Sequence, residues 1–168
     1  MTQVDIQEEI TEFHPLDVAE QVVIANGWHF VRRTDDEIAA EVRGKWCDFS
    51  LHFAWSRDAS AIHYTCAFDM RVPTGMQSAV NDLLAVVNDK MWLGHFGVWN
   101  LEAIPMFRHT ILLRGARESV TVEQMEDLLD VSVAECERFY PAFQFVVWGG
   151  KSPEEAVEAA ILDTVGEA

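Results

Sequence analysis

Two neighbouring segments of the chain alternate between apolar and polar residues. Apolar side chains stand at every second position from Cys47 to Trp55, and the same rule holds from Ile62 to Met70. Alternation with a period of two places each set of side chains on one face of a strand. The pattern therefore predicts an antiparallel hairpin closed by residues 56–61, with a dry face under helices and a polar face in water.

Two further hairpins are predicted, one on either side of this one in the sequence. The first joins residues 28–33 to residues 37–43. The second joins residues 95–101 to residues 106–114, with a turn between them. The sheet is thus expected to contain five to six antiparallel strands.

Apolar residues with a helical repeat separate these hairpins and follow them. Residues 76–92 place their apolar side chains on one stripe, which is typical of a helix that faces a core. Thr121 and Gln124 form a capping-box pattern at the start of a long helix, in which Pro141 predicts a kink or a restart. Shorter helices are expected after Pro15 and after Ser152.

The order of these elements is α-ββββ-α-ββ-α-α. It predicts an α+β fold in which helices cover one face of an antiparallel sheet of five to six strands. A chain of 168 residues is expected to form a single domain, here residues 14–168. Residues 1–13 are polar and acidic with isolated apolar positions, and we expect a flexible arm there.

Charge excludes some partners. Asp and Glu outnumber Lys and Arg by 28 to 12, which gives a formal net charge of −16. An excess of this size repels phosphate backbones and anionic lipid headgroups, so neither nucleic acid nor a membrane surface is an expected partner. The sequence has no apolar run of ~20 residues and no signal-peptide pattern at its start, so we expect a cytoplasmic protein.

Candidate chemistry is sparse. Cys47, Cys66 and Cys136 have no paired spacing, which fits a reducing compartment, and we interpret them as small buried apolar side chains. Residues 149–152 resemble the end of a phosphate-binding loop, but Phe145 stands where that loop needs a glycine. A helix end followed by a helix start explains the same residues. We therefore predict no catalytic residues, no metal and no cofactor, and a weak hydrolase is only the third hypothesis.

The polar face of the central hairpin offers an alternative. His52 and His63 share that face as diagonal neighbours, with Asp69 further along. Two imidazoles without a third convergent ligand form a weak metal site. The alternative is thus a small-molecule or metal-binding domain that uses this face. His109 shares a face with Phe107 instead, and is expected to be a hydrogen-bonded core residue.

One hairpin carries more apolar residues than a single buried face requires. Trp99, Leu101, Met106 and Leu112 lie opposite in parity to neighbours that are expected to face the core. Two interpretations stay open. These four side chains form an exposed apolar strip that contacts another protein, or the last helices fold over this face and bury it.

Five segments of the sequence resemble the YbjN family of bacterial proteins. They are residues 46–48, 67–73, 92–96, 136–145 and 162–168. The resemblance extends from about Pro15 to the C-terminus. It implies a fold similar to that of type III secretion chaperones, often paired as a dimer. It also implies a role in sensory transduction, connected with motility, surface behaviour and stress, without catalytic residues.

The residues and the resemblance together favour one interpretation. We expect a non-enzymatic regulatory or chaperone-like module in the cytoplasm. It would bind another protein through the strip of Trp99, Leu101, Met106 and Leu112, and it would form a homodimer.

Overall fold

The computed structural model describes residues 13–115 and 118–165, and these residues form an α+β fold. The elements in chain order are α1 (Asp17–Ala25), β1 (His29–Thr34), β2 (Glu37–Arg43), β3 (Asp48–Ser56), β4 (Ala61–Phe68), α2 (Gln77–Asn88), β5 (His95–Trp99), β6 (Ile104–Leu112), α3 (Val122–Val147) and α4 (Pro153–Val165). The predicted fold class and element order are confirmed. The arm expected at residues 1–13 lies outside the described residues, apart from Phe13.

The six strands form one antiparallel sheet in the order β1-β2-β3-β4-β6-β5. β3 and β4 pair in the register that closure by residues 56–61 predicts, with Leu51 opposite Cys66 and Ser56 opposite Ala61. β6 adds to β4, so the last hairpin joins the sheet through its second strand. This arrangement leaves β1 and β5 at the two edges of the sheet.

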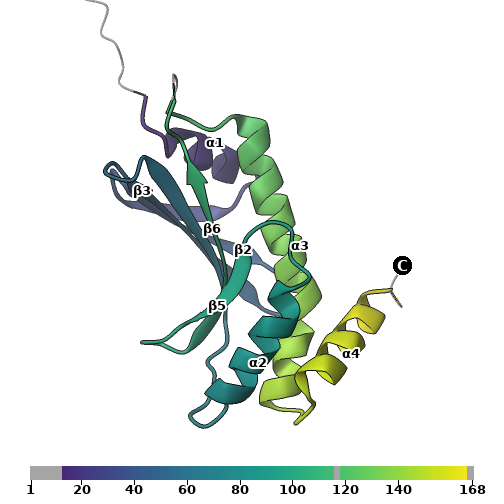
Figure 1. The fold of residues 1–168 in the computed structure, drawn as a ribbon. Helices are drawn as coiled ribbons and strands as arrows, with labels where there is room; N and C mark the ends of the chain where they lie inside the picture. The colour runs from purple at the N-terminus through teal and green to yellow at the C-terminus, as the bar shows by residue number, and fades with distance from the viewer. Residues whose placement is uncertain (1–12, 116–117, 166–168) are drawn as a thin grey trace, which may run out of the picture.

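The helices form a layer on one face of the sheet (Figure 1). α3 packs on β4 and β6 and contacts α1 and α2, while α4 packs against α2 and α3. The strand residues that face this layer are dry: Phe49, Leu51 and Tyr64 are at most 1% exposed. The alternation in the sequence therefore identifies the core face of the sheet correctly.

The long helix α3 begins at the predicted capping box. The Thr121 hydroxyl accepts a hydrogen bond from the Gln124 backbone N–H at 3.1 Å, and the Gln124 side-chain oxygen accepts one from the Thr121 N–H at 2.9 Å. The helix then continues through Pro141 to Val147, so the predicted restart is wrong. Pro141 itself is buried in the core.

Aromatic packing explains why α3 tolerates its proline. Phe68 of β4 contacts both Tyr140 and Phe143 nearly edge to face, with ring centroids 5.2 Å apart in each pair. A proline inside a helix costs about 3 kcal/mol. Each fully buried aromatic side chain contributes about 1.5–3 kcal/mol. The rings on either side of Pro141 therefore offset the lost backbone hydrogen bond and hold the helix together.

The helix α2 ends at Asn88, four residues before the predicted end. The Asn88 side chain forms two hydrogen bonds with the backbone of Phe96, at the end of the helix. It accepts from the Phe96 N–H at 2.7 Å and donates to the Phe96 carbonyl at 3.0 Å. The chain then turns at Gly94, where φ is +66° and an added Cβ would clash with the Phe107 ring. Trp92 is left fully exposed in this loop.

Candidate functional site

The face of the sheet opposite the helices is open in the part of the chain that the structure describes (Figure 1). A groove of about 1090 Å³ crosses this open face. Its lining comes from all six strands and from the turn between β5 and β6. A hollow of this size can hold a peptide segment or a small ligand. It is the candidate functional site.

One row of residues crosses all six strands of the open face. The strand register places these residues side by side: Val31, Ala39, His52, Thr65, Arg108 and His95. Cβ atoms of directly paired residues in an antiparallel sheet lie about 5 Å apart. His52, Thr65, Arg108 and His95 are therefore immediate neighbours, and we call these four residues the basic row.

The next row contains small residues in the middle of the groove floor. Ser50 pairs with Ala67, and Met106 lies between Ala67 and Gly97. An added Cβ at Gly97 would meet Arg108 Cδ at 3.7 Å, so the Arg108 stem lies across this glycine. The small side chains leave depth in the centre of the sheet, where a partner backbone can approach closely.

Arg108 is the electrostatic centre of the open face. It is exposed, and it makes no hydrogen bond or ion pair with any described residue. His63, one row away, holds its Nδ1 atom 2.9 Å from the Thr110 hydroxyl oxygen. Burial lowers the pKa of His63, and the nearby positive charges of Arg108, His52 and His95 lower it further. Arg108 and the three histidines therefore lie close enough to interact electrostatically.

The carboxylates of the open face lie around the basic row. Glu37 Oε2 is 3.9 Å from His52 Nε2, which makes Glu37 the nearest acidic neighbour of His52 that the structure describes. Glu41, Asp48 and Asp69 line the rim of the groove. Asp69 stands four positions beyond Thr65, or about 13 Å along an extended chain. These acids leave Arg108 without a direct counter-charge.

The metal alternative receives no support from this geometry. His52 and His63 are diagonal neighbours, as the register places Ala54 opposite His63. The described residues contain no group of three or more His, Cys, Asp or Glu side chains that could hold a metal ion. Asp69 is too far along the strand to complete the site.

The predicted apolar strip lies partly in this groove. Trp99 is 51% exposed and Leu101 is 89% exposed, and both line the end of the groove at the β5–β6 turn. α3 packs on the other side of the sheet and α4 packs on α2 and α3, so neither helix covers these residues. The interpretation that the last helices bury this face is therefore wrong for Trp99 and Leu101.

For Met106, the prediction of an exposed side chain is wrong. It points to the open face, but it is only 7% exposed. Paired strands flank it on both sides, and the stem of Arg108 lies beside it over Gly97. Met106 is therefore a buried part of the groove floor and cannot be a free contact residue.

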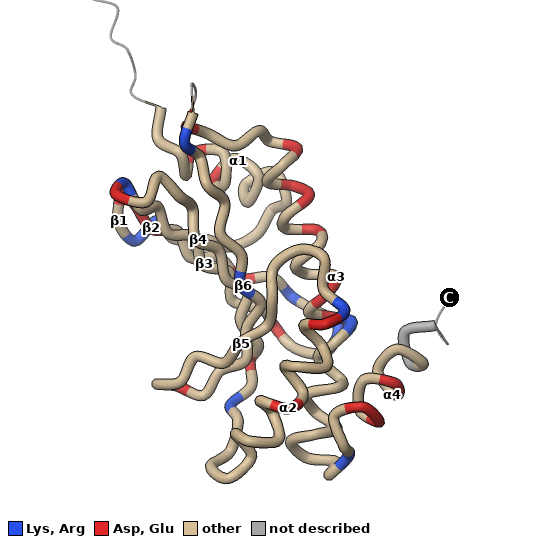
Figure 2. The backbone as a smooth tube through the Cα atoms, in the orientation of Figure 1, with Lys and Arg blue, Asp and Glu red and all other residues tan. Residues whose placement is uncertain are grey.

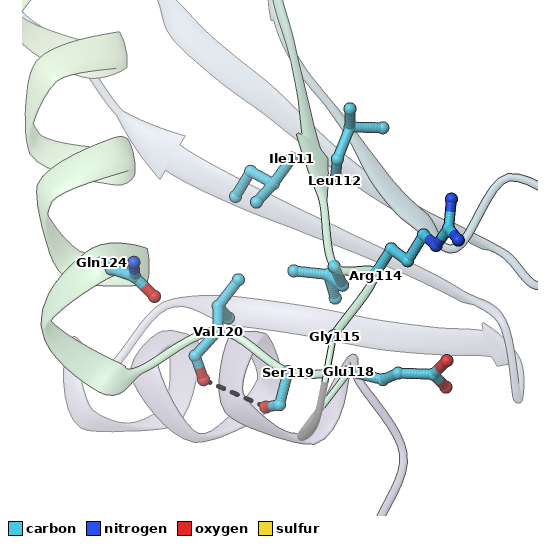
Figure 3. A pocket seen from close by; sticks show the side chains of 9 residues that line it. Ile111, Leu112, Arg114, Gly115, Glu118, Ser119, Val120 and Gln124 are labelled. Atoms are coloured by element: carbon cyan, nitrogen blue, oxygen red, sulfur yellow. Dashed lines mark hydrogen bonds between the residues drawn. The ribbon is translucent and has the colours of Figure 1, made fainter.

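Leu112 is separate from the other strip residues. It is 76% exposed and stands at the far end of β6, six positions or about 20 Å from Met106. A second hollow of about 220 Å³ lies there, beside the start of α3 (Figure 3). In that view Ile111 and Leu112 leave the strand in opposite directions, and the Ser119 hydroxyl donates to the Val120 carbonyl at 3.1 Å. The four predicted residues thus do not form one continuous strip.

His109 and the three cysteines lie outside the groove and are buried or half-buried, which is typical of structural residues. His109 faces the helix side and is half-buried, which lowers its pKa, but the expected hydrogen bond to it is absent among the described residues. Cys66 and Cys136 are buried and Cys47 is half-buried, and all three are free thiols. Burial raises the pKa of Cys47 to about 11 and also raises that of Cys136, so both thiols are protonated at neutral pH.

The glycines at residues 149–150 serve as a helix end, as expected. Trp148 caps α3, and Gly150 adopts a φ of +64°. Ser152 then opens α4, since its hydroxyl accepts from the Glu155 N–H at 3.3 Å. No phosphate-binding loop is formed by these residues.

Negative charge is concentrated in the helical layer (Figure 2). Each helix carries acidic residues, whereas Arg138 is the only Lys or Arg within the bounds of the four described helices. The open face by contrast mixes Arg and His with its carboxylates. Within the described ranges, no helix is long and apolar enough to cross a membrane.

Sequence reasoning missed the residue at the centre of the groove. Arg108 looks in the sequence like an interruption of an apolar strip. Its importance depends on β6 pairing with β4, which brings it beside Thr65 and close to His52 and His63. The signal that could have found it is the placement of four of the six histidines at open-face positions of the strands, namely His29, His52, His63 and His95.

Comparison with known proteins gives a family for this chain. No curated protein matches it. Among solved structures, the chain is similar to one described as "Crystal structure of YbjN, a putative transcription regulator from E. coli", at 12% identity and a TM-score of 0.45, over 71% of this chain and 84% of that one. The family YbjN, described as "Putative bacterial sensory transduction regulator", matches residues 15–145, so the chain belongs to the YbjN family.

Proposed function

We propose that this protein is a non-enzymatic regulatory module that binds a segment of another protein in the groove on its open face. One observation carries the proposal. The helices cover one side of the sheet, and the other side presents a groove of about 1090 Å³ with Trp99 and Leu101 exposed at one end. Exposed aromatic and aliphatic residues beside a concave surface are typical of protein-binding sites.

The shape of the groove favours an extended segment. Small residues at Ser50 and Ala67 allow close approach of a partner backbone over the floor. Trp99 and Leu101 then contact partner side chains at one end. Tryptophan is among the residues that contribute most at interfaces, so its removal is expected to weaken binding by at least about 2 kcal/mol.

The family description names a sensory transduction regulator, which supports the regulatory part of the proposal. The proposal includes a cytoplasmic location, which the sequence pattern favours, and a homodimer, which the resemblance to the family implies. Light scattering of the purified chain over a range of concentrations measures the oligomeric state directly.

Site-specific photo-crosslinking in native cells tests the groove. A photoreactive amino acid at Leu101 is expected to give a discrete adduct with a partner. The same amino acid at Trp92, which is fully exposed outside the groove, is the control and is expected to give none. Equal adducts from both positions would contradict the proposal. A ligand-induced thermal shift without any adduct would favour the small-molecule alternative.

A further inference from the structure

The geometry of the open face points to one class of partner segment: an extended peptide that carries carboxylates next to apolar side chains. This inference rests on the proposed function and adds to it the chemical class of the partner. It is unexpected for a chain with a net charge of −16. It follows from where the few basic residues are placed.

Arg108 supplies the main contact for a carboxylate. Its guanidinium is exposed in the groove and has no hydrogen-bonded or ion-paired partner among the residues described. Arginine presents its N–H groups in a planar fork that matches both oxygens of a carboxylate. Two arginines line the groove, Arg33 and Arg108, and Arg108 is the one that stands on an interior strand of the sheet, β6.

Histidines surround this arginine on the neighbouring strands. His95 and Thr65 flank Arg108 directly, and His52 and His63 follow on β3 and β4. The positive charge of Arg108 contributes to the lowered pKa of His63, and an anion placed beside Arg108 offsets that charge. The acidic groups near the cluster are Glu37, Glu41, Asp48, Asp69 and Glu102. Glu37 lies 3.9 Å from His52, and none of the five forms an ion pair with Arg108 among the described residues.

The apolar end of the groove determines the spacing between the apolar and the acidic side chain of the partner peptide. Ile104 pairs with Trp99 on the same face, four positions from Arg108 along β6. Four residues of extended chain span about 13 Å. A partner strand that lies along β6 therefore presents an apolar side chain to Trp99 and, about four residues away, a carboxylate to Arg108.

The negative charge of the molecule opposes this partner only at long range. The acidic residues of the helices lie in the layer on the other side of the sheet (Figure 2). At physiological ionic strength the Debye length is about 8 Å, so charges beyond the sheet are largely screened. Contacts within the groove are partly desolvated and are screened less. They therefore determine which charge on the peptide is preferred.

Three fluorescent dodecapeptides test the inference. All three contain the same pair of leucines. They differ only at the position four residues from the nearer leucine, which is aspartate, serine or lysine. Fluorescence anisotropy at 0.15 M salt and pH 7 measures their affinities for the full chain. We expect the aspartate peptide to bind about tenfold more tightly than the serine peptide, and the lysine peptide to bind most weakly.

Two variants separate charge recognition from groove binding. Arg108→Gln is expected to remove the preference for aspartate while the serine peptide keeps its affinity. Arg57→Gln removes the same charge from the exposed β3–β4 turn and is expected to change nothing. Equal affinities of the three peptides, or tighter binding of the lysine peptide, would overturn the inference while leaving the groove as a binding site. Failure of all three to bind would contradict the proposed function as well.

Discussion

Tyr64 and Ser132 join the sheet to α3 by a hydrogen bond between their hydroxyl groups, 2.7 Å long and fully buried. The Ser132 hydroxyl is also 3.0 Å from the Leu129 carbonyl, to which it donates. Tyr64 then donates to Ser132. The pair therefore places the phenol of β4 at a defined position beneath the helix.

The first prediction concerns the two partners of this hydrogen bond. Ser132→Ala leaves the buried Tyr64 hydroxyl without this acceptor and is expected to lower the free energy of unfolding by about 1–3 kcal/mol. Tyr64→Phe costs less, since Ser132 keeps its bond to the Leu129 carbonyl. Urea denaturation measures both values. Ser78→Ala, at an exposed position of α2, is the control and is expected to change little. A larger loss for Tyr64→Phe would contradict this reading of the donors.

The second prediction concerns the connection between α2 and β5. Asn88 both accepts from and donates to the Phe96 backbone, at 2.7 and 3.0 Å. Asn88→Ala leaves both partly buried groups unpaired and is expected to cost about 1–3 kcal/mol in unfolding free energy. Asn88→Asp keeps the acceptor but brings a carboxylate to the Phe96 carbonyl, so it is expected to destabilise too. Asn81→Ala, exposed on the same helix, is the matched control.

The third prediction is a loss of stability in mild acid. The pKa values of His63 and His109 are lowered in the folded chain, mainly by burial. As the pH falls through about 6.5, the unfolded chain binds protons before the folded chain does. The two histidines therefore make the free energy of unfolding decrease between pH 7 and pH 5. Urea denaturation across this range is expected to show a smaller decrease for His63→Asn.

Arg108 gives an independent check of that pH dependence. Its positive charge is one cause of the lowered pKa of His63. Arg108→Gln is thus expected to raise the pKa of His63, which NMR titration of the imidazole measures directly. Arg57→Gln, in the β3–β4 turn, serves as the control, because Arg57 is not among the causes of the lowered pKa of His63. An unchanged titration curve for His63 in Arg108→Gln would show that the two side chains do not interact.

Much of the fold could be predicted from the sequence, because it depends on local patterns. Alternation over β3 and β4 identifies the core face, and the capping box at Thr121 and Gln124 identifies the start of α3. The errors occur where tertiary contacts override the local pattern. The apolar stripe extends past Asn88, yet the bond from Asn88 to Phe96 ends α2 there. Aromatic packing likewise carries α3 through Pro141.

The site could be predicted only in part, because it is formed by strands that are distant in sequence. Parity correctly assigns Trp99 and Leu101 to the face away from the core. Parity cannot tell that Met106 is covered by its neighbours, or that Leu112 lies at the other end of the sheet. The basic row depends on the β4–β6 pairing, which no local signal specifies.

The last prediction separates floor from contact residues within the groove. Met106→Ala removes a side chain that is 93% buried, although it lies outside the main core, and is expected to lower the free energy of unfolding by about 2 kcal/mol. Leu101→Ala, at a position that is 89% exposed, is expected to change stability by less than about 0.5 kcal/mol. The Leu101→Ala variant is instead expected to bind a leucine-containing peptide with lower affinity. Urea denaturation and fluorescence anisotropy on both variants give the comparison. If Leu101→Ala destabilised the chain as much as Met106→Ala, the side chain of Leu101 would belong to the folded core and could not be a free contact for a partner.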